Sequence, residues 1–217
     1  MTALFLIILI IALTSSVYSQ APSSPIPLSS ISNSFTRGNP SSDLTVDLWI
    51  DLGCSDCLAE WPLLKSVYET YEDTVKFNYH LFPLPYHQFA FLLAKSANCV
   101  DLHGDAGDVF NFFDIVYTNE NQALIYNSVT ANMTYNDVMT DIVSNFVTES
   151  SASLSADDFL GFMASDYDCE SNTRYQFKNA ALNQIYGTPM YTINGVTVTD
   201  GLSSMDDWTA MIDGLLQ

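Results

Sequence analysis

The alternation of hydrophobic and polar positions predicts a β-α-β unit at the start of the patterned part of the chain. Residues 44–52 are rich in β-branched and aromatic side chains, which favours a strand. Apolar residues recur at helical spacing from Leu64 to Tyr71, so a helix is expected to run to about Glu72. Residues 75–82 predict a second strand. A unit of this kind forms a parallel strand pair with a right-handed crossover.

A long helical segment follows this unit. Residues 87–184 are helical in pattern, with breaks near 104–107, 119–121 and 150–155. A stretch of roughly a hundred residues is far too long for a simple connection between strands. The pattern therefore predicts a helical subdomain inserted into the fold.

A β-hairpin and a helix are predicted to close the chain. Residues 190–193 and 196–199 are β-prone and are joined by Asn194 and Gly195, which both tolerate the positive φ of a type I′ turn. Residues 203–216 begin with serines and aspartates that suit a helix N-terminus.

The first residues predict a signal peptide followed by a flexible leader. The apolar run at 3–13 is too short to cross a hydrocarbon core of ~30 Å as a helix, and Val17 and Ser19 suit signal cleavage. We therefore expect a signal peptide at 1–19, the alternative being an uncleaved anchor. Residues 20–33 are rich in Ser and Pro and are expected to form a leader.

The remaining targeting signals predict a secreted protein or one of the secretory-pathway lumen. No later segment is long and apolar enough to span a bilayer, and the last four residues are not an ER-retention signal. No membrane association is therefore expected after signal cleavage. Asn132 begins the sequon Asn-Met-Thr, which predicts glycosylation at an exposed site.

The charge excludes two classes of partner. The net charge is −19 with only six Lys and Arg residues, which argues against nucleic acid and anionic membrane surfaces, since both require clustered cations. A well-solvated exterior accounts for the acidic residues, and an acidic surface for a basic partner is the alternative. The aspartates at 101, 105 and 108 lack EF-hand spacing, so a calcium loop is rejected.

Cys54 and Cys57 carry the candidate chemistry, because they stand where the first strand gives way to a helix. The N–H groups and dipole at a helix N-terminus stabilise a thiolate, so Cys54 is expected to attack and Cys57 to resolve the mixed disulfide. A zinc site would need two further ligands, and the sequence has neither a second C-x-x-C nor histidines at finger spacing. A purely structural disulfide between the two cysteines is the stronger alternative.

Cys99 and Cys169 remain as the natural second pair in an oxidising compartment. We expect a disulfide that staples the helical insertion. Two free thiols or a second redox pair are the alternatives.

Several short motifs occur in the order and spacing of one known family. They are Gly38-Asn39-Pro40, Asp51-Leu52-Gly53-Cys54, Phe82-Pro83-Leu84-Pro85-Tyr86-His87 and Gly187-Thr188-Pro189 followed by residues 190–195. With these motifs the chain resembles the DsbA-like branch of the thioredoxin superfamily, over about residues 38–216.

The resemblance implies an α/β, thioredoxin-like mixed sheet flanked by helices, with an inserted all-helical subdomain. It implies a thioredoxin-like domain built from 34–86 and 185–217, with 87–184 as the insertion. It also implies that Thr188 and Pro189 lie against the cysteines in a cis-proline loop, where the Thr188 backbone is free to bind an extended substrate. An ordinary trans proline is the alternative.

The departures from the family pattern bear on reactivity. Ser55 replaces the proline that usually follows the first cysteine, and Asp56 stands where strong oxidants carry a histidine. A carboxylate there is expected to raise the pKa of Cys54 towards the value of ~7 in thioredoxin, away from the ~3.5 of a strong oxidant. Leu48 occupies the place of a buried acid, and Asp47, one residue away, points to the opposite face of the strand. His87 is expected to be a packing or capping residue, a catalytic one being the alternative.

The sequence thus predicts a thiol–disulfide oxidoreductase. It would act through the Cys54-Ser55-Asp56-Cys57 pair on protein or peptide thiols and disulfides, with an unidentified redox partner and no metal or organic cofactor. A non-catalytic secreted binding module with a structural disulfide is the alternative, since fold alone does not decide between them.

Overall fold

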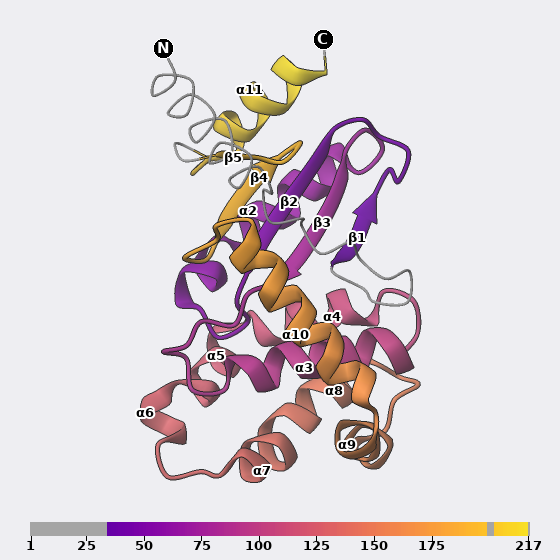
Figure 1. Ribbon diagram of the computed structural model, residues 1–217, viewed down its shortest axis with the longest axis vertical. Coiled ribbons are helices and arrows are strands. Elements are labelled where there is room, and N and C mark those ends of the chain that lie inside the picture. Colours follow the sequence, from indigo (N-terminus) through magenta and orange to yellow (C-terminus); the bar gives the residue numbers. More distant parts are fainter. Residues whose placement is uncertain (1–33, 199–201, 217) are drawn as a thin grey trace, which may run out of the picture.

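The computed structural model describes residues 34–198 and 202–216. The predicted signal peptide at 1–19, the leader at 20–33 and Thr199 of the hairpin lie outside the described residues. A five-stranded mixed sheet forms the upper part of the molecule and a group of helices the lower part (Figure 1). The sheet order is β1-β3-β2-β4-β5, in which only β2 and β3 are parallel neighbours.

The predicted β-α-β unit and closing elements are present, with ends shifted by one or two residues. They are β2 (Thr45–Ile50), α2 (Ser55–Tyr71), β3 (Lys76–Leu81), β4 (Met190–Ile193), β5 (Val196–Val198) and α11 (Met205–Leu215). The hairpin turn has positive φ at both Asn194 (48°) and Gly195 (78°), as the Asn-Gly pair predicts. Ser204 caps α11 by accepting a hydrogen bond from the Asp207 N–H.

The two faces of the central strand β2 are packed differently. Val46, Leu48 and Ile50 belong to the main core with Trp61 and Leu64 of α2. Trp49 projects to the other face, where it packs in a smaller cluster with Phe82, Leu84, Ala180, Ile185 and Met190. Helix α10 (Tyr167–Leu182) supplies Ala180 to this cluster and crosses in front of the sheet and the lower helices in Figure 1. Because side chains alternate along β2, this strand contributes to the packing on both faces of the sheet.

Helices fill the chain between β3 and β4, as the pattern predicts. Besides α10 they are α3 (Ala90–His103), α4 (Asp108–Val116), α5 (Asn119–Ile125), α6 (Asn127–Thr130), α7 (Tyr135–Val138), the π-helical turn η1 (Met139–Val143), α8 (Ser144–Ser150) and α9 (Ala156–Ser165). Buried aromatic residues such as Phe112, Phe113 and Phe159 join them to the main core. None of the described helices is long and apolar enough to cross a membrane.

Three local predictions were wrong. The first helix of the insertion begins at Ala90, not at His87, because two turns precede it, in which the N–H groups of His87 and Ala90 donate to the carbonyl oxygens of Leu84 and His87. The expected break at 119–121 is the first turn of α5, and the chain breaks at Tyr117 and Thr118, where Thr118 accepts a capping hydrogen bond from the Asn121 N–H. Strand β1 (Phe35–Gly38) was not predicted, and it pairs antiparallel with β3 at the sheet edge.

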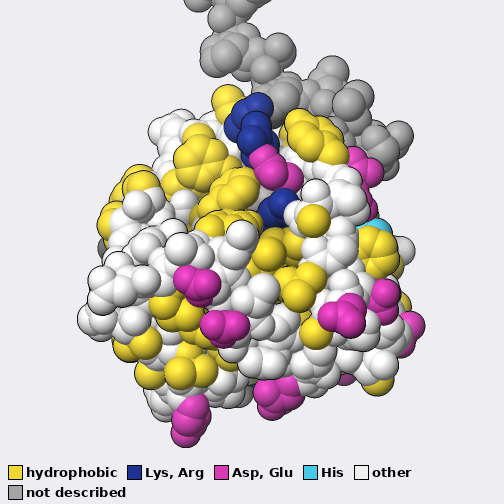
Figure 2. All heavy atoms as spheres, turned by 90° about the horizontal axis from the view of Figure 1, so that it is seen from below, with side chains coloured by type: hydrophobic (Ala, Val, Ile, Leu, Met, Phe, Trp, Pro, Cys, Tyr) yellow, Lys and Arg dark blue, Asp and Glu magenta, His cyan; other side chains and the backbone are white. Residues whose placement is uncertain are grey.

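Acidic side chains are dispersed over the lower end of the molecule. Figure 2 views this end, with aspartates and glutamates scattered among hydrophobic and neutral polar side chains and with Lys and Arg near the upper rim. A scattered arrangement of this kind suits a solvated exterior better than a single acidic docking surface.

Candidate active site

Cys54 lies at the junction that the sequence predicts, as the N-cap residue of α2. Its backbone is extended (φ −89°, ψ 125°), and the helix begins at the next residue. Cys54 and Cys57 are both unbridged, with 5% and 1% of their surface exposed. The Cys54 sulfur therefore meets the unpaired N–H groups of the first helical turn, while Cys57 lies one turn further inside.

The helix N-terminus and the partner cysteine lower the pKa of the Cys54 thiol to about 6. The largest cause is a hydrogen bond from Cys57, and burial opposes it. The backbone N–H groups of Cys57 and Asp56 add to the downward shift. The expected upward shift from Asp56 is thus outweighed, because this residue acts on Cys54 mainly through its backbone N–H. The value still lies nearer to that of thioredoxin (~7) than to that of a strong oxidant (~3.5).

The environment of Cys57 disfavours its thiolate, whereas that of Cys54 favours it. Burial, the hydrogen bond to Cys54 and the negative charge of Cys54 raise the pKa of the Cys57 thiol well above its ordinary value. Two of these three causes come from Cys54 and disappear once its sulfur is bound in a disulfide. The pair is therefore arranged so that Cys54 ionises first and Cys57 later.

Thr188 and Pro189 lie against Cys54. The Thr188–Pro189 peptide bond is cis, and the Cys54 thiol donates to the Thr188 carbonyl oxygen over 3.4 Å. Both residues are half-buried in the loop that leads into β4. The structure thus brings together four of the predicted site residues, which come from two segments more than 130 positions apart.

Asp51 and His87 form a second feature of the site. Asp51 follows β2 and is 1% exposed, and its Oδ2 is 2.6 Å from His87 Nδ1. The two carboxylate oxygens also accept hydrogen bonds from the N–H groups of Gly53 (2.9 Å) and Leu84 (3.0 Å). His87 therefore does not cap a helix. Its contact with Asp51 holds the loop between β3 and α3 against the end of β2 that precedes Cys54.

Two buried residues contact the site although the sequence did not predict them as site residues. The Tyr117 hydroxyl donates to the Asp51 carbonyl oxygen over 3.0 Å, and the Gln122 side-chain amide donates to the Leu52 carbonyl oxygen. Both come from the start of the α5 region, about seventy positions along the chain. No local motif marks either residue, because their partners are backbone oxygens of a distant turn.

Asp47 lies on the face of β2 that is turned away from the cysteines, as the strand alternation predicts. Its carboxylate contacts His80 Nε2 (2.9 Å) and accepts hydrogen bonds from Asn78 (3.0 Å) and Thr192 (3.0 Å). Leu48 is 2% exposed in the main core. The site therefore lacks an acid at position 48, and Asp47 does not replace it.

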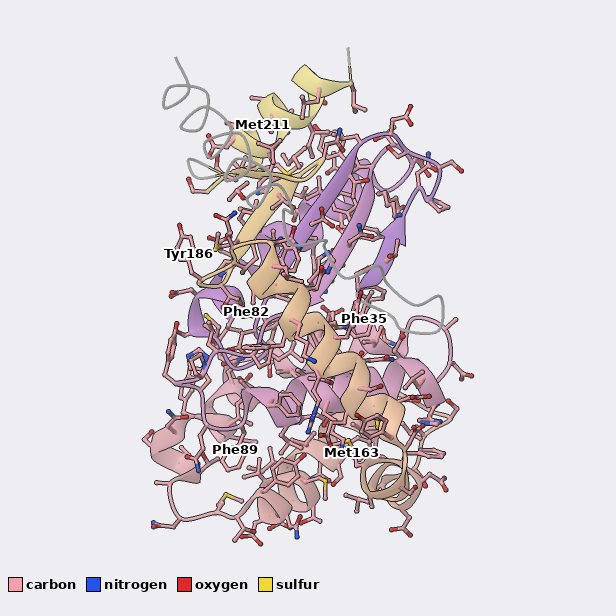
Figure 3. All side chains as sticks on the ribbon, viewed as in Figure 1. Phe35, Phe82, Phe89, Met163, Tyr186 and Met211 are labelled. Atoms are coloured by element: carbon pink, nitrogen blue, oxygen red, sulfur yellow. A yellow bond between two sulfur atoms is a disulfide. The ribbon has the colours of Figure 1, made fainter. Side chains whose placement is uncertain are left out.

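A cavity of about 290 Å³ opens beside Cys54. Gly53, Ser55 and His87 line one side, and α3 and the α5–α6 junction line the other with residues that include Leu93 and Ile125. Figure 3 labels Phe82 and Phe89 at the two ends of the loop that carries His87, on the same side of the molecule as Tyr186 of the loop before Thr188. The loop that carries His87 and the loop before Thr188 therefore lie on the same side of the molecule.

The other predicted residues lie away from this site. Cys99 and Cys169 form a disulfide (S–S 2.01 Å) that joins α3 to α10, and both are fully buried. His103 and Asp166 lie close to Cys169, but the Cys169 sulfur is bound to Cys99, so this group offers no metal-ligating thiolate. Asn132 is exposed in the turn before α7.

Comparison with known proteins places this geometry in a family. A family model described as thioredoxin matches residues 30–214. No curated protein matches the sequence. Among solved structures, a putative protein-disulfide isomerase from Pseudomonas syringae is 18% identical with a TM-score of 0.64, and the match covers 83% of this chain and 96% of that one.

Two further structures share the fold at similar distance. Oxidised BdbD from Bacillus subtilis is 15% identical with a TM-score of 0.62, over 85% of this chain and 93% of that one. MdbA, a thiol-disulfide oxidoreductase from Actinomyces oris, is 16% identical with a TM-score of 0.62, over 84% and 85%. The chain belongs to the thioredoxin family.

Proposed function

We propose that the protein is a thiol–disulfide oxidoreductase that acts on protein or peptide substrates through Cys54 and Cys57. The observation that carries the proposal is the position of Cys54: a thiol with a pKa of about 6 at a helix N-terminus, facing the cis Thr188–Pro189 bond. A purely structural cysteine pair needs no lowered pKa.

In the reductive direction, the Cys54 thiolate attacks one sulfur of a substrate disulfide. A Cys54–substrate disulfide forms, the substrate S–S bond breaks, and the leaving thiolate takes a proton from water. Cys57 then loses its proton and attacks Cys54, which forms the Cys54–Cys57 disulfide and releases the second substrate thiolate. The substrate gains two electrons and the cysteine pair loses two, and oxidation of a dithiol follows the same steps in reverse.

The order of the two attacks follows from the charges at the site. While Cys54 is a thiolate, its charge opposes ionisation of Cys57. Once Cys54 is in the mixed disulfide that charge is gone, and Cys57 ionises more readily at the moment when its attack is required. Position 48 carries no acid, so we propose that the Cys57 proton leaves without the aid of a carboxylate at that position.

The substrate and its location are further parts of the proposal. Thr188 and Pro189 would bind the backbone of an extended substrate segment beside Cys54, as an added strand binds a sheet edge. We propose that the reaction takes place in the secretory pathway or outside the cell, which a signal peptide at 1–19 and a glycan on Asn132 would support. An unidentified redox partner would restore the cysteine pair after each cycle.

Insulin reduction by dithiothreitol tests the proposal. The wild-type protein is expected to accelerate the appearance of turbidity, and Cys54→Ser is expected to give the uncatalysed rate. Replacement of both Cys99 and Cys169 by alanine is the matched control, since it removes two sulfurs remote from the site. A wild-type rate equal to the uncatalysed rate would refute the proposal and leave the binding-module alternative.

A further inference from the structure

All three histidines of the chain contact an aspartate, but only one of these pairs lies at the cysteines. The pairs are His80 with Asp47 at 2.9 Å, His87 with Asp51 at 2.6 Å and His103 with Asp166 at 2.7 Å. His103 stacks on Phe162 at the far end of the helical group. The pair at Asp51 thus stands out by its position rather than by its chemistry.

Asp51 is held in place as a buried carboxylate. It is 1% exposed, and the N–H groups of Gly53 and Leu84 and the His87 ring satisfy its two oxygens. A carboxylate at this depth needs a compensating positive charge or several hydrogen bonds. His87, with a quarter of its side chain exposed, is the cationic group placed to supply that charge.

His87 also lies directly beside the residue that precedes the nucleophile. A Cβ atom added to Gly53 would lie 3.4 Å from His87 Cβ, and both residues line the cavity that opens beside Cys54. Among the described residues that line this cavity, none is a lysine or an arginine. The titratable side chains around His87 and Cys54 are Asp51, Asp56, Cys57, Tyr86, Tyr117 and Tyr126. None of these groups can carry a positive charge, so a protonated His87 ring would be the cation beside Cys54.

We propose that Asp51 and His87 are positioning residues. The buried Asp51 carboxylate keeps the His87 ring protonated beside Cys54, and the protonated ring favours the Cys54 thiolate. This inference rests on the proposed function, since it explains how a thiolate is supported where Asp56 replaces the histidine that strong oxidants carry between their cysteines. The direction of the electrostatic effects agrees: Asp51, Cys54 and Asp56 raise the pKa of His87, and burial opposes them. Two groups coupled in this way each shift the titration of the other.

A charge-removing variant tests the effect on Cys54. His87→Gln keeps an amide that can donate to Asp51 but cannot carry a positive charge. The midpoint of thiolate formation, followed by absorbance at 240 nm in the reduced protein, is expected to rise from about 6 towards the ordinary thiol value. A rise of one unit would shift the equilibrium with a glutathione buffer at pH 7 about fivefold towards the disulfide. His103→Gln is the matched control, because it makes the same change in a remote Asp–His pair and is expected to leave the midpoint unchanged.

The reciprocal measurement does not depend on a variant at His87. NMR titration of the His87 ring in reduced wild type and in Cys54→Ser is expected to show a lower pKa in the variant, because the thiolate is absent. An unchanged Cys54 midpoint in folded His87→Gln, or an identical His87 titration in both proteins, would overturn the inference and leave His87 as a structural clip. Exchange activity decides the proposed function separately: an active protein without coupling refutes only this inference, and an inactive protein with coupling supports it.

Discussion

The two cysteine pairs of this chain show how position in a fold decides the chemistry of sulfur. Cys99 and Cys169 lie inside facing helices, are fully buried and are joined in a disulfide. Cys54 and Cys57 are also buried, but Cys54 is the cap of a helix and faces the Thr188 carbonyl oxygen. The sulfurs of the first pair are bound to each other and do not ionise, whereas Cys54 of the second pair meets helix N–H groups that favour a thiolate.

The difference assigns separate tasks to the two pairs. A bridge across a loop of seventy residues restricts the unfolded chain and stabilises the helical insertion. A pair with one ionised and one protonated sulfur is poised for exchange. Loss of the first is therefore expected to cost stability, and loss of the second to cost activity.

The largest expected effect is the loss of exchange in Cys54→Ser, because the pKa of the other thiol at the site, Cys57, is raised by burial and by Cys54. Cys57→Ser is the matched variant, one helical turn away, and is expected to retain the first attack and accumulate mixed disulfides with substrate. Non-reducing electrophoresis with a protein substrate distinguishes the two. Equal trapping by both variants, or activity in Cys54→Ser, would contradict the roles assigned here.

Removal of the Cys99–Cys169 bridge is expected to act on stability instead. On the chain-entropy model, a closed loop of seventy residues contributes roughly 4 kcal/mol to the free energy of unfolding. Cys99→Ala combined with Cys169→Ala is expected to lose about that amount in urea unfolding while its exchange rate per folded molecule stays the same. A loss of exchange with no loss of stability would show that the bridge serves the redox cycle.

The stability of the reduced protein is expected to depend on pH through Cys54. Its pKa is lowered to about 6 in the folded state, whereas an unfolded thiol titrates near ~8.5. Between these values the unfolded chain binds more protons, so stability rises with pH across this window and is lost as pH falls through 6. Above ~8.5 the raised pKa of Cys57 reverses the trend, because the folded state then keeps a proton that the unfolded state has lost.

Urea unfolding of the reduced protein at a series of pH values, with the Cys99–Cys169 bridge intact, measures this dependence. Cys54→Ser is the control and is expected to lack the rise between pH 6 and 8.5. The same rise in wild type and variant would assign it to other groups.

The smallest expected effect concerns Asp56. Its side chain is exposed and acts on Cys54 mainly through the backbone, so Asp56→His is expected to lower the Cys54 pKa by less than His87→Gln raises it. A histidine there adds a positive charge near the thiolate, which shifts the glutathione equilibrium towards the reduced form. Thiolate absorbance against pH compares the two variants, and a larger shift in Asp56→His would place the main charge control between the cysteines.

The sequence predicts most of this fold because its elements carry local signals. The strand before Cys54, the helix after it and the Asn194-Gly195 turn follow from periodicity and turn chemistry. Strand β1 escapes prediction because four residues with one buried end show no clear alternation, and its pairing with β3 is a tertiary contact.

The candidate site is predictable only where its residues form local motifs, as is true of the strands and helices. The Cys54–Cys57 motif and the Thr188–Pro189 loop are local in sequence, so the amino-acid sequence alone is enough to identify them. The Asp51–His87 contact joins residues 36 positions apart, and Tyr117 reaches a backbone oxygen of Asp51 from 66 positions away. Such contacts depend on how the insertion packs on the sheet, which no local pattern records.

The rate of Cys54 alkylation as a function of pH measures whether Cys54 is the ionised and reactive cysteine of the pair. Reduced protein is treated with iodoacetamide between pH 4 and 10, and peptide mapping follows Cys54 and Cys57 separately. Cys54 is expected to react with a midpoint near pH 6, while Cys57 stays unmodified until far higher pH. A Cys54 midpoint at the ordinary thiol value of ~8.5, or equal reaction of both cysteines, would contradict this expectation.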